Sequence, residues 1–187
     1  ELMKDRNNIL KIVPDHLDKE QILPWVINNF YDIEDVEDRH VLLKHGWTLS
    51  EFPRHSNLNY EVMSLITDSE DYRYMMSYED LVSFVKLPDI VKVYRGIVVP
   101  EDKEPIKESN CDNDYISIGI SWTTNKDKGL WFGKRYTDLG TYKNHTPYLL
   151  ESTIKKRYIY CYLNGRKEDE VIVDPSWFNS KIKVTRL

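Results

Sequence analysis

Cysteine is scarce in this chain of 187 residues, which has only Cys111 and Cys161, 50 residues apart. Without a Cys-x-x-Cys spacing, the sequence indicates neither a disulfide framework nor a cysteine zinc site. Long apolar runs are lacking too, since none approaches the roughly 20 residues that a membrane span requires. These absences predict a soluble protein of a reducing compartment, with no membrane partner.

Positive charge is not in excess, because the chain has 26 Lys and Arg residues and 31 Asp and Glu residues, which gives a net charge of −5. A broad surface for nucleic-acid phosphates needs clustered Lys and Arg. The densest basic run is Lys155-Lys156-Arg157, at an expected turn where a solvated charge cluster is the ordinary interpretation. A nucleic-acid partner is therefore not expected.

The chain also lacks the sequence signals of several cofactor sites. It contains no Gly-x-x-x-x-Gly-Lys-Ser/Thr loop and no Gly-x-Gly-x-x-Gly, which disfavours a phosphate-loop nucleotidase and a Rossmann dehydrogenase. His40 and His45 stand five residues apart, whereas two metal ligands on one helix face stand four apart. We expect no metal.

The hydrophobic periodicity changes near residue 88, from helical spacing to short strand-like runs. The pattern predicts an α+β fold with a helical part, 1–88, and a β-rich part, 89–187, joined in one compact unit. The predicted helices cover 18–30, 33–44 with an end at Gly46, 57–68, 77–85, and a stretch that Asn125 begins. The predicted strands cover 91–98, 115–123, 148–155, 157–163, 170–173 and 181–185.

Acidic residues open one of these strands, in Glu168-Asp169-Glu170 followed by Val171-Ile172-Val173. Strand alternation would set the carboxylates of Glu168 and Glu170 on one face, roughly 7 Å apart, with Asp169 facing away. The tripeptide alone fits a solvated strand entry at least as well, because charged residues often flank hydrophobic strands. A chemical site is the other interpretation.

Two further strands carry polar residues that an apolar strand does not need. Arg95 lies in Val91 to Val99, where a buried guanidinium requires an anion or carboxylate, although an exposed arginine on an edge strand would also explain it. Gly96 beside it indicates a close approach of a ligand or of another backbone. Ser121 and Thr123 share one face of the next strand.

Taken in order, Tyr94-Arg95-Gly96, Ser121-Trp122-Thr123 and Glu168-Asp169-Glu170 resemble the Arg, Ser-x-Thr/Ser and Glu-x-Glu signatures of the cholera-toxin-like mono-ADP-ribosyltransferases. This family includes bacterial toxins and the transferases with which bacteriophages modify host proteins. The resemblance covers residues 91–174. It implies a mixed β-sandwich ADP-ribosyltransferase core after the helical part. In the helix after the serine strand, Gly129 and Gly133 stand where the family usually has alanines.

The resemblance implies NAD as co-substrate and assigns roles to individual residues. Arg95 would bind the pyrophosphate or ribose of NAD, and the backbone at Gly96 would hydrogen-bond the nicotinamide amide. Glu170 would stabilise the oxocarbenium-like ribose that forms when nicotinamide leaves. Ser121 would fix the Glu170 rotamer, and Thr123 would offer a second hydroxyl on the same face.

The remaining roles concern the acceptor and the aromatic residues. Glu168 would bind the incoming nucleophile, and the family's Glu at this place goes with arginine acceptors of a target protein. Trp122, Trp131 and Phe132 would stack on nicotinamide or adenine, although core packing is the common role of such aromatics.

Three activities stay open at this point. The first is mono-ADP-ribosyl transfer to protein arginines, and the second is NAD glycohydrolysis or transfer to a nucleic acid on the same fold. The third is an idle NAD-binding or protein-interaction domain. We expect a cytoplasmic location, in the host cell if the chain derives from a phage or a toxin.

Overall fold

The protein is described by a computed structural model that covers residues 9–50, 58–69, 71–103, 119–138, 140 and 142–187. The chain divides into two compact units, Glu1–Ser77 and Tyr78–Leu187. The second unit thus begins before the position 89 suggested by the periodicity, because the helix that follows Ser77 packs on a strand of the sheet. In the described residues, no helix is long and apolar enough to cross a membrane.

The first unit is helical and consists of α2 (Lys19–Asn29), α3 (Val36–Leu49) and α4 (Leu58–Asp68), with 3-10 turns at Leu10–Ile12, Phe30–Asp32 and Tyr72–Met75. Asp18 caps α2 as expected, since its backbone N–H donates to Gln21 Oε1 at 2.9 Å in a capping box. Fully buried apolar side chains form the core of this unit: Leu23, Val26, Phe30, Leu42, Leu43, Val62 and Ile66.

The predicted end of the second helix at Gly46 is wrong. Asp35 caps α3, accepting a hydrogen bond from the Asp38 backbone N–H at 3.1 Å, and the helix continues to Leu49. A Cβ at position 46 would lie 2.9 Å from the Leu23 Cα. Gly46 therefore allows α2 and α3 to approach closely, and it does not terminate the helix.

The second unit contains one six-stranded sheet with the strand order β4-β5-β2-β1-β3-β6. It comprises β1 (Ile90–Pro100), β2 (Ser121–Thr123), β3 (His145–Lys155), β4 (Ile159–Leu163), β5 (Glu170–Val173) and β6 (Lys183–Arg186), with the helices α5 (Tyr78–Val85) and α6 (Lys126–Asp138). The α+β class is confirmed. The expected mixed β-sandwich is not: all pairings between these strands are antiparallel and they join one sheet.

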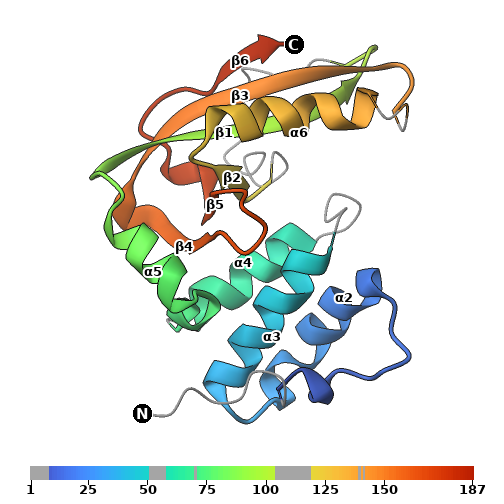
Figure 1. The fold of residues 1–187 in the computed structure, drawn as a ribbon, viewed down its shortest axis with the longest axis vertical. Coiled ribbons are helices and arrows are strands. Elements are labelled where there is room, and N and C mark those ends of the chain that lie inside the picture. Colours follow the sequence, from blue (N-terminus) through green and yellow to red (C-terminus); the bar gives the residue numbers. More distant parts are fainter. Residues whose placement is uncertain (1–8, 51–57, 70, 104–118, 139, 141) are drawn as a thin grey trace. The chain divides into compact units, whose positions relative to one another are not determined.

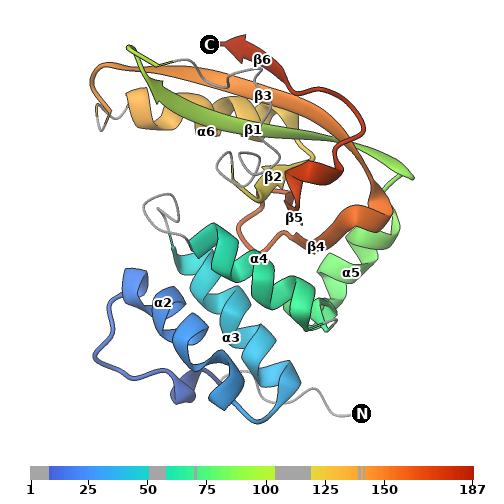
Figure 2. The same cartoon turned by 180° about the vertical axis from the view of Figure 1, so that it is seen from behind.

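The pairing between neighbouring strands is shortest in the middle of the sheet. Between β1 and β2 the described register contains a single pair, Tyr94↔Thr123, whereas β1 and β3 pair along their whole length. Seen from behind, β1 and β3 run side by side as two long strands (Figure 2). Of the predicted strand 115–123, residues 115–118 lie outside the described residues.

Helix α6 lies along β1 and β3 (Figure 1). Asn125 caps it, because Asn125 Oδ1 accepts hydrogen bonds from the backbone N–H groups of Asp127 and Lys128 at 3.0 and 3.4 Å. A Cβ on Gly96 of β1 would overlap the backbone of Gly129 and Gly133 in α6. The strand glycine therefore marks the approach of another backbone, one of the two explanations that the sequence left open.

Candidate active site

Three residues from three strands are connected by consecutive hydrogen bonds in the middle of the sheet, where β1 and β2 share a single paired position. Arg95 Nη1 of β1 donates to the backbone oxygen of Ser121 in β2. Ser121 Oγ donates to Glu170 Oε1 of β5 at 2.5 Å. The register explains the meeting, since Tyr94 pairs with Thr123 and Thr123 pairs with Glu170. The structure thus brings together the arginine, serine and glutamate of the three sequence motifs.

Gly119 shapes the environment of Arg95, a role that the sequence did not reveal. Its φ of +87° is a conformation that favours glycine. A Cβ at this position would lie 2.7 Å from Arg95 Cζ and still closer to one guanidinium nitrogen. Glycine at 119 therefore both permits the turn before β2 and leaves room for the guanidinium.

The carboxylate of Glu170 is buried, with its side chain 8% exposed. A buried carboxylate needs hydrogen bonds and opposite charge to compensate for lost hydration. Ser121 provides the short hydrogen bond, and Arg166 Nη2 lies 3.9 Å from Glu170 Oε2. The Glu170 carboxylate is therefore held in one orientation, at a position that water reaches poorly.

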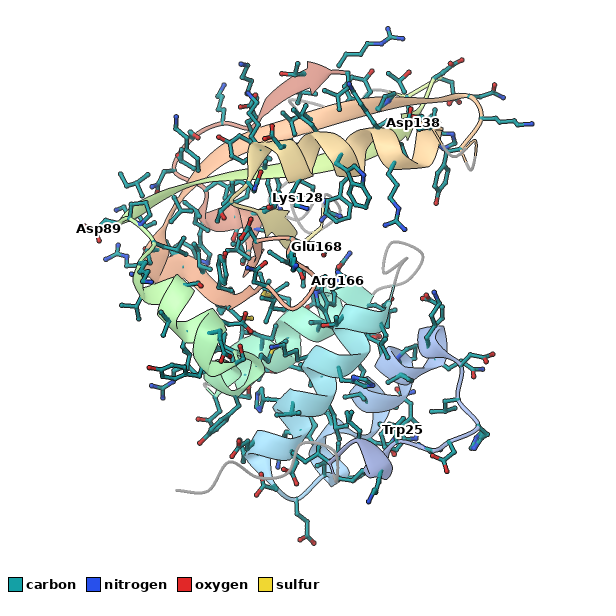
Figure 3. All side chains as sticks on the ribbon, viewed as in Figure 1. Trp25, Asp89, Lys128, Asp138, Arg166 and Glu168 are labelled. Carbon is teal, nitrogen blue, oxygen red and sulfur yellow. The ribbon has the colours of Figure 1, made fainter. Side chains whose placement is uncertain are left out.

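The Glu168 carboxylate also lies beside Glu170, but Glu168 is not part of the strand as the alternation argument assumed. Strand β5 begins only at Glu170, and Asp169 has a φ of +50°, so Glu168 belongs to the preceding loop. Arg166 Nη2 lies 2.8 Å from Glu168 Oε2 and so stands against both carboxylates. Figure 3 shows the Arg166 and Glu168 side chains next to each other in this loop.

The pKa of Glu168 is raised above its ordinary value of 4.5, chiefly because its carboxylate is partly buried. The positive charge of Arg166 opposes this shift, the negative charge of Glu170 adds to it, and Arg135 of α6 lowers the pKa slightly. A carboxylate with a raised pKa is a stronger base than an ordinary glutamate. Glu168 is therefore suited to accept a proton.

Asp169 anchors the loop through hydrogen bonds to residues other than those that bind the two glutamates. Its carboxylate accepts hydrogen bonds from the Tyr162 hydroxyl at 2.7 Å and from Asn125 Nδ2 at 3.2 Å. Its backbone N–H donates to Asn164 Oδ1 at 3.1 Å. Burial of Tyr162, with its hydrogen bond to Asp169, raises the pKa of that phenol. The loop is thus fastened to β4 and to the start of α6.

Thr123 belongs to this support and not to the face expected for a ribose. Its side chain is buried, and its hydroxyl donates to the Glu168 backbone oxygen at 2.7 Å while accepting from the Asn125 backbone N–H at 3.1 Å. Both partners of the hydroxyl are main-chain atoms. The role of Thr123 is therefore to hold the main chain of Glu168.

The aromatic residues divide between the core and the surface. Trp122 is 2% exposed, donates from Nε1 to the Gly119 backbone oxygen and packs edge-on against Phe178, so the predicted ligand contact of Trp122 is replaced by a core role. Phe132 is half-buried on α6 and contacts the exposed Trp131 edge-on. A stacking role for Phe132 stays a prediction.

Arg166 is the main site residue that the motifs did not reveal. The signal was present, because a basic residue stands two and four positions before the two carboxylates in Arg166-Lys167-Glu168-Asp169-Glu170. A loop carries no side-chain periodicity from which its direction follows. Charge complementarity with Glu168 and Glu170 was the available clue.

Comparisons of the chain with protein-family models, with curated proteins and with solved structures gave no match. Within the described residues, no group of three or more His, Cys, Asp or Glu side chains is arranged to hold a metal ion.

Proposed function

We propose that the chain is a NAD-dependent mono-ADP-ribosyltransferase that transfers ADP-ribose from NAD to arginine side chains of target proteins and releases nicotinamide. The observation that carries the proposal is the hydrogen-bonded connection Arg95–Ser121–Glu170, with the Glu168 carboxylate beside it. Three residue types that the reaction needs, contributed by three strands, meet at one point. Their order along the chain is also that of the family signatures.

Glu170 carries the central electrostatic role. NAD supplies a glycosidic bond to a positively charged nicotinamide, whose departure leaves positive charge on the ribose. A fixed carboxylate beside that ribose stabilises the charge, and the stabilisation is larger where water is excluded. Glu170 is 6% exposed and its rotamer is fixed by Ser121, which makes it pre-organised for this role.

Arg95 is assigned to binding the phosphates or ribose of NAD. Its guanidinium is oriented by the Ser121 backbone oxygen and lies against Gly119, so that binding NAD costs little side-chain entropy. An arginine offers several N–H donors in a planar arrangement that matches phosphate oxygens. The main chain at Gly96 is assigned to the nicotinamide amide.

Glu168 is assigned to the acceptor arginine. A carboxylate binds a guanidinium through two parallel hydrogen bonds and can take the proton that the attacking nitrogen loses. The raised pKa of Glu168 favours that proton transfer. The chain's own Arg166 lies on this carboxylate at 2.8 Å, so the residue is accessible to a guanidinium in this geometry.

The test is incubation of the chain with labelled NAD and a cell extract. Transfer to arginine predicts label on proteins that hydroxylamine releases, together with free nicotinamide. Replacing Glu170 by Gln keeps its shape and removes its charge, which should lower both products about 10²–10³-fold. The matched control is Glu151→Gln in β3 of the same sheet, which breaks ion pairs with Lys126 of α6 and Lys183 of β6.

Two other results would change the conclusion. Nicotinamide release without labelled macromolecules would favour a NAD glycohydrolase, and label on nucleic acid would replace the protein target. A Glu168→Ala variant separates the steps, because it should abolish transfer and leave some NAD hydrolysis. Absence of both label and nicotinamide would contradict an enzymatic role.

A further inference from the structure

The guanidinium of Arg166 occupies the position that the proposed reaction assigns to an acceptor. Its Nη2 lies 2.8 Å from Glu168 Oε2 and 3.9 Å from Glu170 Oε2. The Arg166 side chain remains 38% exposed, while the carboxylates beneath it are 16% and 8% exposed. A nucleophile, its base and the proposed cation-stabilising carboxylate are thus contributed by five consecutive residues.

We propose that Arg166 is a site of self-modification, at which the chain attaches ADP-ribose from NAD to its own guanidinium. This inference rests on the proposed transferase function. It goes further by naming the first acceptor and by making the transfer intramolecular. The ion pair to Glu168 then serves as the docking contact of a tethered substrate.

The loop holds Arg166 close to the carboxylates. The Lys167 backbone N–H donates to the Asn164 backbone oxygen at 2.9 Å, and both Lys167 and Asp169 have positive φ. Asp169 is fastened to Tyr162 and Asn125 by its side chain. A group held beside its reaction partner reacts as though it were present at very high concentration. A foreign arginine at ordinary concentration has to displace Arg166 from Glu168 before it can react.

Three other arginines of this unit are held differently. Arg95 donates to the Ser121 backbone oxygen, the Arg135 guanidinium lies 5.0 Å from the Trp131 ring centroid, and that of Arg157 lies 4.8 Å from the Tyr158 ring centroid. Among the ion pairs of the described residues, only that of Arg166 joins an arginine to Glu168. Selective modification at position 166 follows from this arrangement.

The chemical balance of the step is simple. A guanidinium nitrogen of Arg166 forms a bond to the ribose anomeric carbon of NAD as the bond from that carbon to the nicotinamide nitrogen breaks. The bonding electron pair leaves with nicotinamide, which becomes neutral. Glu168 takes one proton from the attacking guanidinium and later passes it to water. No oxidant, reductant or further reactant is needed.

The experiment uses the whole chain with NAD alone, followed by peptide mass spectrometry. The expected result is one ADP-ribose on the peptide that contains Arg166, formed at a first-order rate that does not change when the protein is diluted tenfold. Arg166→Lys keeps the positive charge but not the guanidinium, and should lower the label on this peptide at least tenfold. The matched control Arg157→Lys should leave it unchanged.

A parallel reaction with the small guanidine agmatine separates this inference from the proposed function. Modified agmatine with an unmodified Arg166 would overturn self-modification and leave the transferase intact. Label spread over several arginines, at a rate proportional to protein concentration, would also overturn it. Failure of agmatine modification together with absence of nicotinamide release would remove the proposed function and this inference with it.

Discussion

The hydrogen bond between Ser121 and Glu170 makes the sharpest prediction, through the substitution Ser121→Ala. The substitution removes one oxygen atom and leaves β2 otherwise unchanged. Glu170 then loses the 2.5 Å bond that fixes its carboxylate, although Arg166 remains 3.9 Å away. We expect the Glu170 carboxylate to lose its single orientation.

The size of the effect follows from the bond type. A hydrogen bond to a charged group contributes about 1.5–3 kcal/mol. If the bond is needed in full at the transition state, nicotinamide release should slow about 10- to 150-fold, because each 1.4 kcal/mol is a factor of ten. This loss is smaller than the one expected for Glu170→Gln, because the carboxylate itself remains.

The assay measures nicotinamide release at saturating NAD, with urea unfolding as the parallel stability measurement. Ser152→Ala in β3 is the matched control, since the Ser152 hydroxyl donates to the Ser180 backbone oxygen at 2.9 Å in a bond that is partly buried, as the Ser121 bond is. Both variants lose one partly buried hydroxyl bond and should be destabilised to a similar extent. Only Ser121→Ala should be slow.

The reasoning is refuted if both serine variants release nicotinamide at the rate of the unmodified protein. It is also refuted if both slow equally, because the Ser121 effect would then be one of general stability. A double substitution gives a further check. In a Glu170→Gln background, Ser121→Ala should add little to the loss, since the charge that it orients is gone.

Three further predictions concern pH and packing. Transfer by the unmodified chain should fall as the pH drops through the raised pKa of Glu168, above 4.5. The residual nicotinamide release of Glu168→Gln should lack this acidic limb, and a limb that persists there contradicts the assignment. Burial lowers the pKa of His40 in the folded chain below its ordinary value of 6.5. As the pH falls through 6.5, the unfolded chain therefore binds more protons than the folded chain. The free energy of unfolding should consequently decrease from pH 7.5 to 5.5. This decrease should shrink in His40→Gln, and an unchanged decrease would exclude His40 as its source. Gly96→Ala should lower the free energy of unfolding in urea by about 1–3 kcal/mol, because the new Cβ overlaps the α6 backbone. Gly165→Ala has open space around its Cβ and should be nearly neutral, so equal losses in the two glycine variants would contradict the packing argument.

The fold class was predictable because hydrophobic periodicity reports local structure directly. The helices α2, α4 and α5 and the strands β1, β3 and β5 lie close to their predicted ranges. The misassigned helix end at Gly46 has a tertiary cause, since that glycine accommodates Leu23 of a neighbouring helix. Sheet pairing and strand order depend on contacts distant in sequence, so the single antiparallel sheet of the described strands could not be derived from periodicity.

The site was only partly readable from the sequence for a related reason. Arg95, Ser121 and Glu170 could be selected because strand context makes their polarity unusual, and the structure connects them. Arg166 lies in a loop, where no periodicity gives its direction. Thr123 has the residue type of a ligand-binding hydroxyl, but loop hydrogen bonds take that hydroxyl instead.

The most direct measurement of the central claim is the formation of ADP-ribosyl-agmatine from NAD, quantified by mass spectrometry for the unmodified chain, Glu170→Gln and Glu151→Gln. We expect product from the unmodified chain and from Glu151→Gln, with a loss of about 10²–10³-fold in Glu170→Gln. Product formation that is equal in the two glutamate variants, or neither product nor nicotinamide from the unmodified chain, would contradict it.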